Sequence, residues 1–175
     1  MTLLTDEVRA FIGVESAREV AVDRVEAGAI RRYVQAIMDD DPLFHDPELH
    51  DAMNGPVAPA LFPVSMFRRP LGTEDPLSAR AEDPTFDGLV VAMGERLPEI
   101  VPLRHLALLN GGAEFEFYRY ARVGEIVSQL SRYADIVERQ TSKGPMIFVT
   151  IETDYFGSDD DLLLRARKTT IRRPR

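Results

Sequence analysis

The sequence predicts an α+β domain, in which apolar helices come first and an antiparallel sheet follows. Two patterns along the chain support this prediction. Apolar side chains recur at helical spacing in the N-terminal part, in one stripe formed by Ile30, Tyr33, Val34, Ile37 and Met38. From Asn110 onwards the period is two, because Phe115 and Phe117 alternate with glutamates as in a half-buried strand. A chain of 175 residues suffices for one core, so we expect a single domain over residues 1–175.

Capping residues mark the starts of two helices. Thr5 and Asp6 can cap a short helix that ends at Gly13. Asp23, followed three residues later by Glu26, has the form of a capping box. We expect the striped helix to begin there.

Prolines limit the next segments. Pro42 removes a backbone donor and should end the striped helix, and residues 47–53 can form one more helical turn. Residues 57–67 are almost wholly apolar, which is typical of an element buried on all sides. We expect a central buried helix that starts at Pro59 and is kinked at Pro63.

An insertion of about residues 68–105 separates this helix from the sheet. Residues 68–82 are rich in Pro, Gly, Asp and Glu, which predicts an exposed connection. Residues 87–100 carry a further helical pattern, formed by Leu89, Val90, Met93 and Leu97.

Four strands are expected in the C-terminal half. The first contains Phe115 and Phe117, and the others cover residues 126–138, 145–156 and 161–172. Short turns rich in Gly, Ser and Asp separate them. Strands joined by such turns are antiparallel neighbours, so these four should form a meander.

Composition excludes several classes of function. A formal net charge of −8 argues against a nucleic-acid partner, because phosphate binding needs a basic surface. The absence of cysteine excludes disulfides, thiolate zinc sites and a cysteine nucleophile. The N-terminus has no signal-peptide pattern, and no apolar run approaches about 18 residues. A cytoplasmic protein without membrane contact is therefore expected.

An acid and an imidazole follow the striped helix. Asp39 and His45 stand at the two ends of Asp-Asp-Asp-Pro-Leu-Phe-His, on an irregular stretch of the kind that often carries catalytic groups. The structural alternatives are a histidine that caps a loop and a solvated run of aspartates. Anions are disfavoured at a helix C-terminus, which favours a functional reason for this run. Metal binding by His45 and His50 is not expected, because their spacing places them on different helical faces.

Several short motifs occur in an order that resembles a known family. After the aspartate–histidine segment come Val-Ala-Pro-Ala-Leu-Phe at 57–62, Asn-Gly-Gly-Ala-Glu-Phe-Glu-Phe-Tyr-Arg at 110–119, Arg-Val-Gly-Glu at 122–125, Gly-Pro-Met-Ile-Phe-Val at 144–149 and Arg-Lys-Thr-Thr-Ile-Arg-Arg at 167–173. From Phe11 to Arg172 the chain resembles the MaoC-like hydratases and dehydratases. In particular it resembles the branch called the N-terminal half of MaoC dehydratase, which is similar to the dehydratase domain of type I fatty acid synthases.

This resemblance implies a hot-dog fold, a long helix wrapped by a curved antiparallel sheet, paired as a homodimer or as a heterodimer with a second hot-dog subunit. It implies a lyase of fatty acid metabolism that acts on acyl thioesters of coenzyme A (acyl-CoA) or of acyl carrier protein (acyl-ACP). The family adds water reversibly across the double bond of a 2-enoyl thioester, with no cofactor and no metal. An Asp and a His hold the water, and a backbone N–H at the start of the buried helix polarises the thioester carbonyl.

The resemblance assigns residues with two departures from the family pattern. Asp39 takes the place of the acid, His45 that of the histidine, and Asp41 stands where asparagine is usual. Phe44 is an extra residue before the histidine, so if spacing decides, Asp40 is the acid. At the start of the buried helix, Val-Ala-Pro-Ala replaces a His-Gly pair.

Other assignments stay open. A proline cannot donate a hydrogen bond, so the carbonyl would be polarised by Ala60 or a neighbour. Gly111 and Gly112 are either a flexible entry to the sheet or a place where substrate or a partner chain approaches the backbone. The C-terminal basic residues either protect an edge strand or bind coenzyme A phosphates. They are Arg165, Arg167, Lys168, Arg172, Arg173 and Arg175.

Three functions are consistent with these residues. The leading one is an enoyl-thioester hydratase or dehydratase, in which the insertion covers or widens the acyl end of the pocket. The second is a non-catalytic hot-dog subunit that shapes the acyl pocket of a catalytic partner. The third, a hot-dog thioesterase, is less favoured because the Asp-Pro-His order belongs to hydratases.

Overall fold

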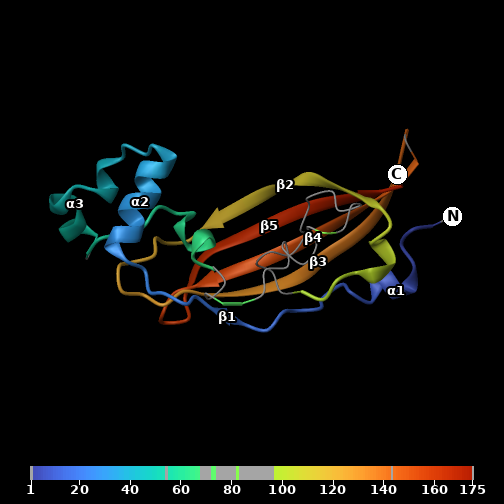
Figure 1. Ribbon diagram of the computed structural model, residues 1–175, viewed down its shortest axis with the longest axis horizontal. Coiled ribbons are helices and arrows are strands. Elements are labelled where there is room, and N and C mark those ends of the chain that lie inside the picture. Colours follow the sequence, from blue (N-terminus) through green and yellow to red (C-terminus); the bar gives the residue numbers. More distant parts are fainter. Residues whose placement is uncertain are drawn as a thin grey trace.

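A five-stranded antiparallel sheet forms the body of the chain (Figure 1). The computed structural model describes residues 2–53, 55–67, 72–73, 82, 97–142 and 144–174. In sequence order the strands are β1 (Glu19–Val20), β2 (Ala107–Phe117), β3 (Ser128–Thr141), β4 (Gly144–Phe156) and β5 (Leu162–Arg173). Their order across the sheet is β1-β3-β4-β5-β2, so β2 lies at one edge.

The expected meander is right for three strands and wrong for the fourth. β3, β4 and β5 are successive antiparallel neighbours, as their short turns require. β2, however, pairs with β5 and not with β3. The reason is the connection of residues 118–127, which is long enough to cross the end of the sheet instead of turning back on β2. On its way it contacts the β4–β5 turn, where the Ile126 N–H donates to Ser158 Oγ at 2.8 Å.

Two apolar clusters share one face of the sheet. Ile147, Val149, Ile151 and Tyr155 alternate along β4, which places their side chains on the same side. The first three belong to the cluster that packs under the N-terminal segment. Tyr155 belongs to the cluster under the striped helix. The helices of the two clusters lie at opposite ends of the sheet (Figure 1).

Short helices cover the two ends. α1 (Asp6–Arg9) is capped by Thr5, whose side chain accepts from the Val8 N–H at 3.3 Å, as the sequence predicts. α2 (Ala27–Ile37) buries Ile30 and Val34 of the predicted stripe. Its N-cap is Glu26, whose side chain makes no capping hydrogen bond, so the predicted capping box is wrong. α3 (Pro47–Ala52) is the expected additional turn.

The predicted central helix from Pro59 is wrong within the described residues. The apolar segment instead forms a short 3₁₀ helix, η2 (Phe62–Met66). Its bonds span three residues, since the Phe62 N–H donates to the Pro59 carbonyl and the Val64 N–H to the Leu61 carbonyl. Two prolines in a short segment remove the donors that a longer α-helix needs. Of the helix expected over residues 87–100, residues 87–96 lie outside the described residues, and 97–100 are not helical.

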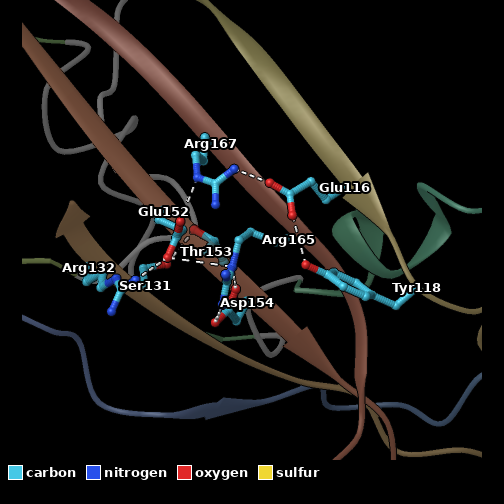
Figure 2. Close-up of polar contacts among 9 residues, drawn as sticks. All are labelled: Glu116, Tyr118, Ser131, Arg132, Glu152, Thr153, Asp154, Arg165 and Arg167. Atoms are coloured by element: carbon cyan, nitrogen blue, oxygen red, sulfur yellow. Dashed lines mark hydrogen bonds and ion pairs between the residues drawn. The ribbon is translucent and has the colours of Figure 1, made fainter. Parts of the chain in front are cut away.

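The opposite face of the sheet carries a charged network (Figure 2). Its centre is Glu152, which is buried with only 5% of its side chain exposed, between Arg132 of β3 and Arg165 and Arg167 of β5. Arg167 also pairs with Glu116 of the edge strand. The long arginine stems shield the carboxylate from water, so the face is polar but well packed.

Two of the C-terminal arginines are therefore already paired with acids of this sheet. Arg165 forms a two-pronged pair with Asp154, with nitrogen–oxygen distances of 2.6 and 2.7 Å. Arg167 is held by Glu152 at 2.7 Å and by Glu116. This arrangement favours a structural role over phosphate binding for these two residues.

Candidate functional site

The segment that follows α2 begins with a left-handed residue. Met38 has φ 55° and ψ 39°, and its N–H donates to the Gln35 carbonyl at 3.3 Å. The Asp39 N–H closes the helix end by donating to the Val34 carbonyl at 3.1 Å. The helix thus ends at Ile37, well before Pro42, because the left-handed conformation of Met38 turns the chain away first.

The three aspartates have different surroundings. Asp39 is half-buried and accepts from the Asp41 N–H at 3.1 Å. Asp41 caps the 3₁₀ helix η1 (Pro42–Phe44), since its carboxylate accepts from the Leu43 N–H at 2.9 Å. Asp40 is exposed, and its carboxylate makes no hydrogen bond to any described residue. Asp41 is thereby engaged in shaping the turn, whereas Asp39 is an acid held in a fixed, partly desolvated position.

His45 closes the same turn. Its N–H donates to the Pro42 carbonyl at 3.1 Å, and its imidazole is exposed. Within the part of the chain that the structure describes, the imidazole makes no hydrogen bond to Asp39 or to another residue. Asp39 and His45 therefore stand at the two ends of one short turn, and the structure shows no direct bond between their side chains.

The extra residue Phe44 faces the core. It packs against the apolar cluster under α2, and its ring meets the Tyr120 ring edge to face, with centroids 6.0 Å apart and an interplanar angle of 83°. Phe44 is the last residue of the single turn η1, which is closed by hydrogen bonds from the Phe44 N–H to the Asp41 carbonyl and from the His45 N–H to the Pro42 carbonyl. Phe44, the residue that the resemblance makes an additional one, is thus an apolar anchor for the turn.

The second predicted part of the site, the segment that leads to Ala60, is bonded to the connection between β2 and β3. The Ala58 N–H donates to the Ala121 carbonyl at 2.9 Å, and Val57 forms an isolated antiparallel bridge with Arg122. Ala60 follows in the turn that leads into η2, and it is half-buried. The Ala60 N–H has no hydrogen-bond acceptor among the described residues.

Arg119 fixes this connection. Its guanidinium binds Asp161 of the β4–β5 turn and Glu125, at 2.7 and 2.9 Å, and donates to the Tyr120 carbonyl at 2.8 Å. The hydrogen bond from Arg119 lowers the pKa of the Asp161 carboxyl, and the bond to Asp161 raises the pKa of Arg119. We name residues 118–127, locked in this way, the docking connection.

Sequence reasoning did not find the docking connection. Arg119 and Asp161 are 42 positions apart, and Phe44 and Tyr120 are farther apart still. Charge complementarity alone cannot choose Asp161 among the chain's many acids. The one available signal was the length of the segment after β2, which exceeds that of a hairpin turn.

Gly111 and Gly112 lie in the middle of β2, at a bulge between Asn110 and Gly112. A Cβ on Gly111 would stand 2.8 Å from the Thr169 carbonyl of β5, so the close approach is made by a strand of the same chain. Gly112 has φ 112°, and its N–H donates to Asn110 Oδ1 at 2.9 Å. These contacts account for both glycines through the bulge.

Neither a metal cluster nor a membrane span is found in the described residues. Among them, no three His, Asp or Glu side chains are grouped in a way that could hold a metal ion. Likewise, no helix in the described ranges is long and apolar enough to cross a bilayer.

Comparisons with known proteins bear on the family and the fold of the chain. Residues 10–165 match the family described as FAS1-like, dehydratase domain region. No curated protein matches the chain. Among solved structures, the chain is similar to one in the ChsH1-ChsH2 complex from Mycobacterium tuberculosis, with a TM-score of 0.65, 20% identity, and coverage of 90% of this chain and 83% of that chain.

Two further structures extend the likeness. The MaoC-like dehydratase from Rhodospirillum rubrum has a TM-score of 0.57 and 22% identity, with 94% of each chain covered. The C-terminally truncated HadBC complex, a 3R-hydroxyacyl-ACP dehydratase from Mycobacterium tuberculosis, has a TM-score of 0.55 and 16% identity, with coverage of 92% of this chain and 96% of that chain.

These likenesses confirm the expected α+β hot-dog fold. The family match covers most of the sequence and confirms the resemblance to dehydratases. The chain belongs to the family of FAS1-like dehydratase domain regions.

Proposed function

We propose that this chain hydrates 2-enoyl thioesters and, in reverse, dehydrates 3-hydroxyacyl thioesters. One observation carries the proposal: the docking connection holds both the turn that bears Asp39 and His45 and the segment that leads to Ala60. Water activation and carbonyl polarisation need groups on two such segments at a fixed spacing. The membership of a dehydratase family supports the same reaction.

In the proposed mechanism, Asp39 and His45 hold one water. One of them takes a proton from the water as its oxygen bonds to the β-carbon, and the other gives a proton to the α-carbon, so that H and OH add across the double bond. The electrons of that bond pass transiently onto the thioester oxygen. The Ala60 N–H donates to this oxygen and stabilises its charge. The dehydration runs through the same steps in reverse, and no cofactor takes part.

The surroundings of the aspartates favour Asp39 as the acid. It is half-buried and held by the Asp41 N–H, whereas Asp40 is exposed. A fixed, partly desolvated group loses less entropy and feels less screening than a mobile surface group. The acyl group of the proposed substrate is bound as a thioester to coenzyme A or to acyl carrier protein.

A second hot-dog subunit is the proposed partner, in a homodimer or a heterodimer. β2 pairs with β5 and has no second partner strand among the described residues, and an edge strand of this kind can pair with another chain. The neighbours named ChsH1-ChsH2 and HadBC are complexes. The exposed imidazole of His45, which has no bond to Asp39, favours a second candidate function, that of a non-catalytic subunit that shapes the acyl pocket of its partner.

One assay tests these alternatives. The purified chain, alone and with a second hot-dog subunit, is incubated with crotonyl-CoA or a longer 2-enoyl-CoA, and loss of enoyl absorbance and release of thiol are followed. We expect hydration without thiol release. His45→Ala should reduce the rate about 10²- to 10⁴-fold. The matched control is His105→Ala, which changes an exposed histidine in the segment before β2 and should leave the rate unchanged.

Each alternative outcome has a distinct meaning. If hydration requires the second subunit and survives His45→Ala, this chain is the non-catalytic member of the pair. Thiol release without hydration identifies a thioesterase. Comparing Asp39→Asn with Asp40→Asn assigns the acid, because we expect only the first to lower the rate.

A further inference from the structure

The turn that carries Asp39 and His45 is shaped by local bonds. Among the described residues, the hydrogen bonds of the segment 39–46 reach no farther than five positions along the chain. Such bonds determine the form of the turn but not its place relative to the sheet. That place must come from side-chain packing.

Phe44 provides this packing. It is half-buried against the apolar cluster under α2, and it meets Tyr120 edge to face. Asp41 and His45 flank it within the same 3₁₀ turn, with the Phe44 N–H bonded to the Asp41 carbonyl at 3.1 Å. The His45 N–H is bonded in turn to the Pro42 carbonyl at 3.1 Å, so we expect a shift of the Phe44 ring to displace His45 as well.

Tyr120 is itself a fixed point. Arg119 donates to its carbonyl at 2.8 Å, and the next residue, Ala121, accepts from the Ala58 N–H at 2.9 Å. The segment that leads to Ala60 is thus bonded one residue away from the ring that holds Phe44. Two parts of the proposed site are therefore attached to the same short stretch of backbone, residues 120 and 121.

We propose that Phe44 and Tyr120 are positioning residues that set the distance between the Asp39–His45 turn and the Ala60 N–H. This inference rests on the proposed function. It assigns a role to Phe44, the residue by which this chain departs from the family spacing. The Tyr120 ring acts by contact, and its hydroxyl is not required.

The chain contains a matched control for the experiment. Phe11 is also half-buried, and it meets Tyr133 edge to face with centroids 6.0 Å apart and an interplanar angle of 87°, in the other apolar cluster. Phe44→Ala and Phe11→Ala therefore remove similar contacts, one at the site and one away from it. Any general loss of stability should be similar in the two variants.

The full chain, in whichever form hydrates 2-enoyl-CoA, is assayed for kcat, KM and thermal midpoint. We expect Phe44→Ala and Tyr120→Ala to lower kcat about 10- to 100-fold with little change in KM, because the misplaced groups act in the transition state. Phe11→Ala should lower the thermal midpoint as much and leave kcat unchanged. Tyr120→Phe should keep the kcat of the unaltered chain. The kcat of the double variant Phe44→Ala/Tyr120→Ala should be no lower than that of the more affected single variant.

Three outcomes would overturn the inference. Equal kcat losses in Phe44→Ala and Phe11→Ala indicate a merely structural role. Failure of Tyr120→Phe to restore kcat indicates that the hydroxyl takes part in the chemistry. If the unaltered chain hydrates no 2-enoyl-CoA with or without a partner, the proposed function itself fails, and this is visible before any variant is compared.

Discussion

At one end of the sheet Phe44 meets Tyr120 edge to face, and at the other end Phe11 meets Tyr133 in the same way. The surroundings of the two pairs differ. Around Tyr120 lie Arg119 and its acidic partners, which lock an irregular connection in place. Around Tyr133 the packing is mainly apolar, between α1, the strands and the 3₁₀ helix η3 (Val101–Leu103).

A carboxylate also has a different task at each end. Glu138 of β3 accepts from the N–H groups of Leu3 and Leu4 and from the Thr2 hydroxyl, and these bonds lower the pKa of its carboxyl. It ties down a chain terminus. Asp161 instead holds Arg119 and, through it, the backbone that contacts the two segments of the proposed site. We therefore expect one end to serve stability alone and the other to serve positioning as well.

Truncations of core side chains should have the largest effect, and they test whether the two ends of the sheet differ in their influence on activity. Leu163 and Ile147 are both fully buried, one in each cluster. Leu163→Ala and Ile147→Ala should each lower the free energy of unfolding by about 2–5 kcal/mol, measured by urea denaturation. The backbone of Leu163 is bonded to the docking connection, since its carbonyl accepts from the Tyr118 N–H. A shift of this backbone after truncation of the side chain would therefore reach the connection. Only Leu163→Ala is expected to lower kcat as well, and an equal kcat loss in Ile147→Ala would contradict the division between the ends.

The charged face offers the next largest effect. Glu152→Gln removes a buried charge that three arginines share, and should destabilise the fold by about 2 kcal/mol, reduced from the value for a fully buried pair because the arginines are partly exposed. This network lies on the far side of the sheet from both clusters. We expect unchanged kcat at a temperature where the variant is folded. A selective kcat loss would place part of the site on this face.

The same division explains what the sequence could predict. The stripe of α2 and the strands β3, β4 and β5 follow from periodicity and short turns, which are local properties. The partner of β2 does not, because pairing at a distance depends on which strand edge remains free. The predicted helix after Pro59 failed because apolar composition indicates burial but not helix.

For the candidate site, the sequence and the resemblance supplied the groups but not what holds them. Asp39 and His45 were chosen from a motif, and their roles remain predictions. Asp41, by contrast, is seen to cap η1, and Gly111 to admit a strand of its own chain. The contact of Phe44 with Tyr120 joins residues with no local relation, and such contacts arise only when the chain is folded.

The Arg119 lock should show a pH dependence with a defined sign. Arg119 lowers the folded pKa of Asp161, so the pair stabilises the fold above the unfolded value of about 3.9 and loses this contribution as pH falls through the folded pKa. Asp161→Asn should cost about 1 kcal/mol at pH 7, since Asp161 is 44% exposed and its pairing is screened. In urea titrations from pH 7 to 3 the two proteins should converge. A constant difference would show that the lock is not ionic.

The smallest effect expected is a gain in stability at Met38. This residue adopts a left-handed conformation, with φ 55°, and its side chain is 88% exposed, so it has the strain of the αL region without compensating packing. Met38→Gly relieves that strain at some cost in unfolded-chain entropy, and should raise the free energy of unfolding by about 0.5 kcal/mol. Ala36→Gly, in the helix just before it, should do the opposite by about 1 kcal/mol. If Met38→Gly gains stability but lowers kcat, then the strained residue that leads into Asp39 helps to hold the proposed site, and the positioning end of the molecule begins at the residue directly after α2.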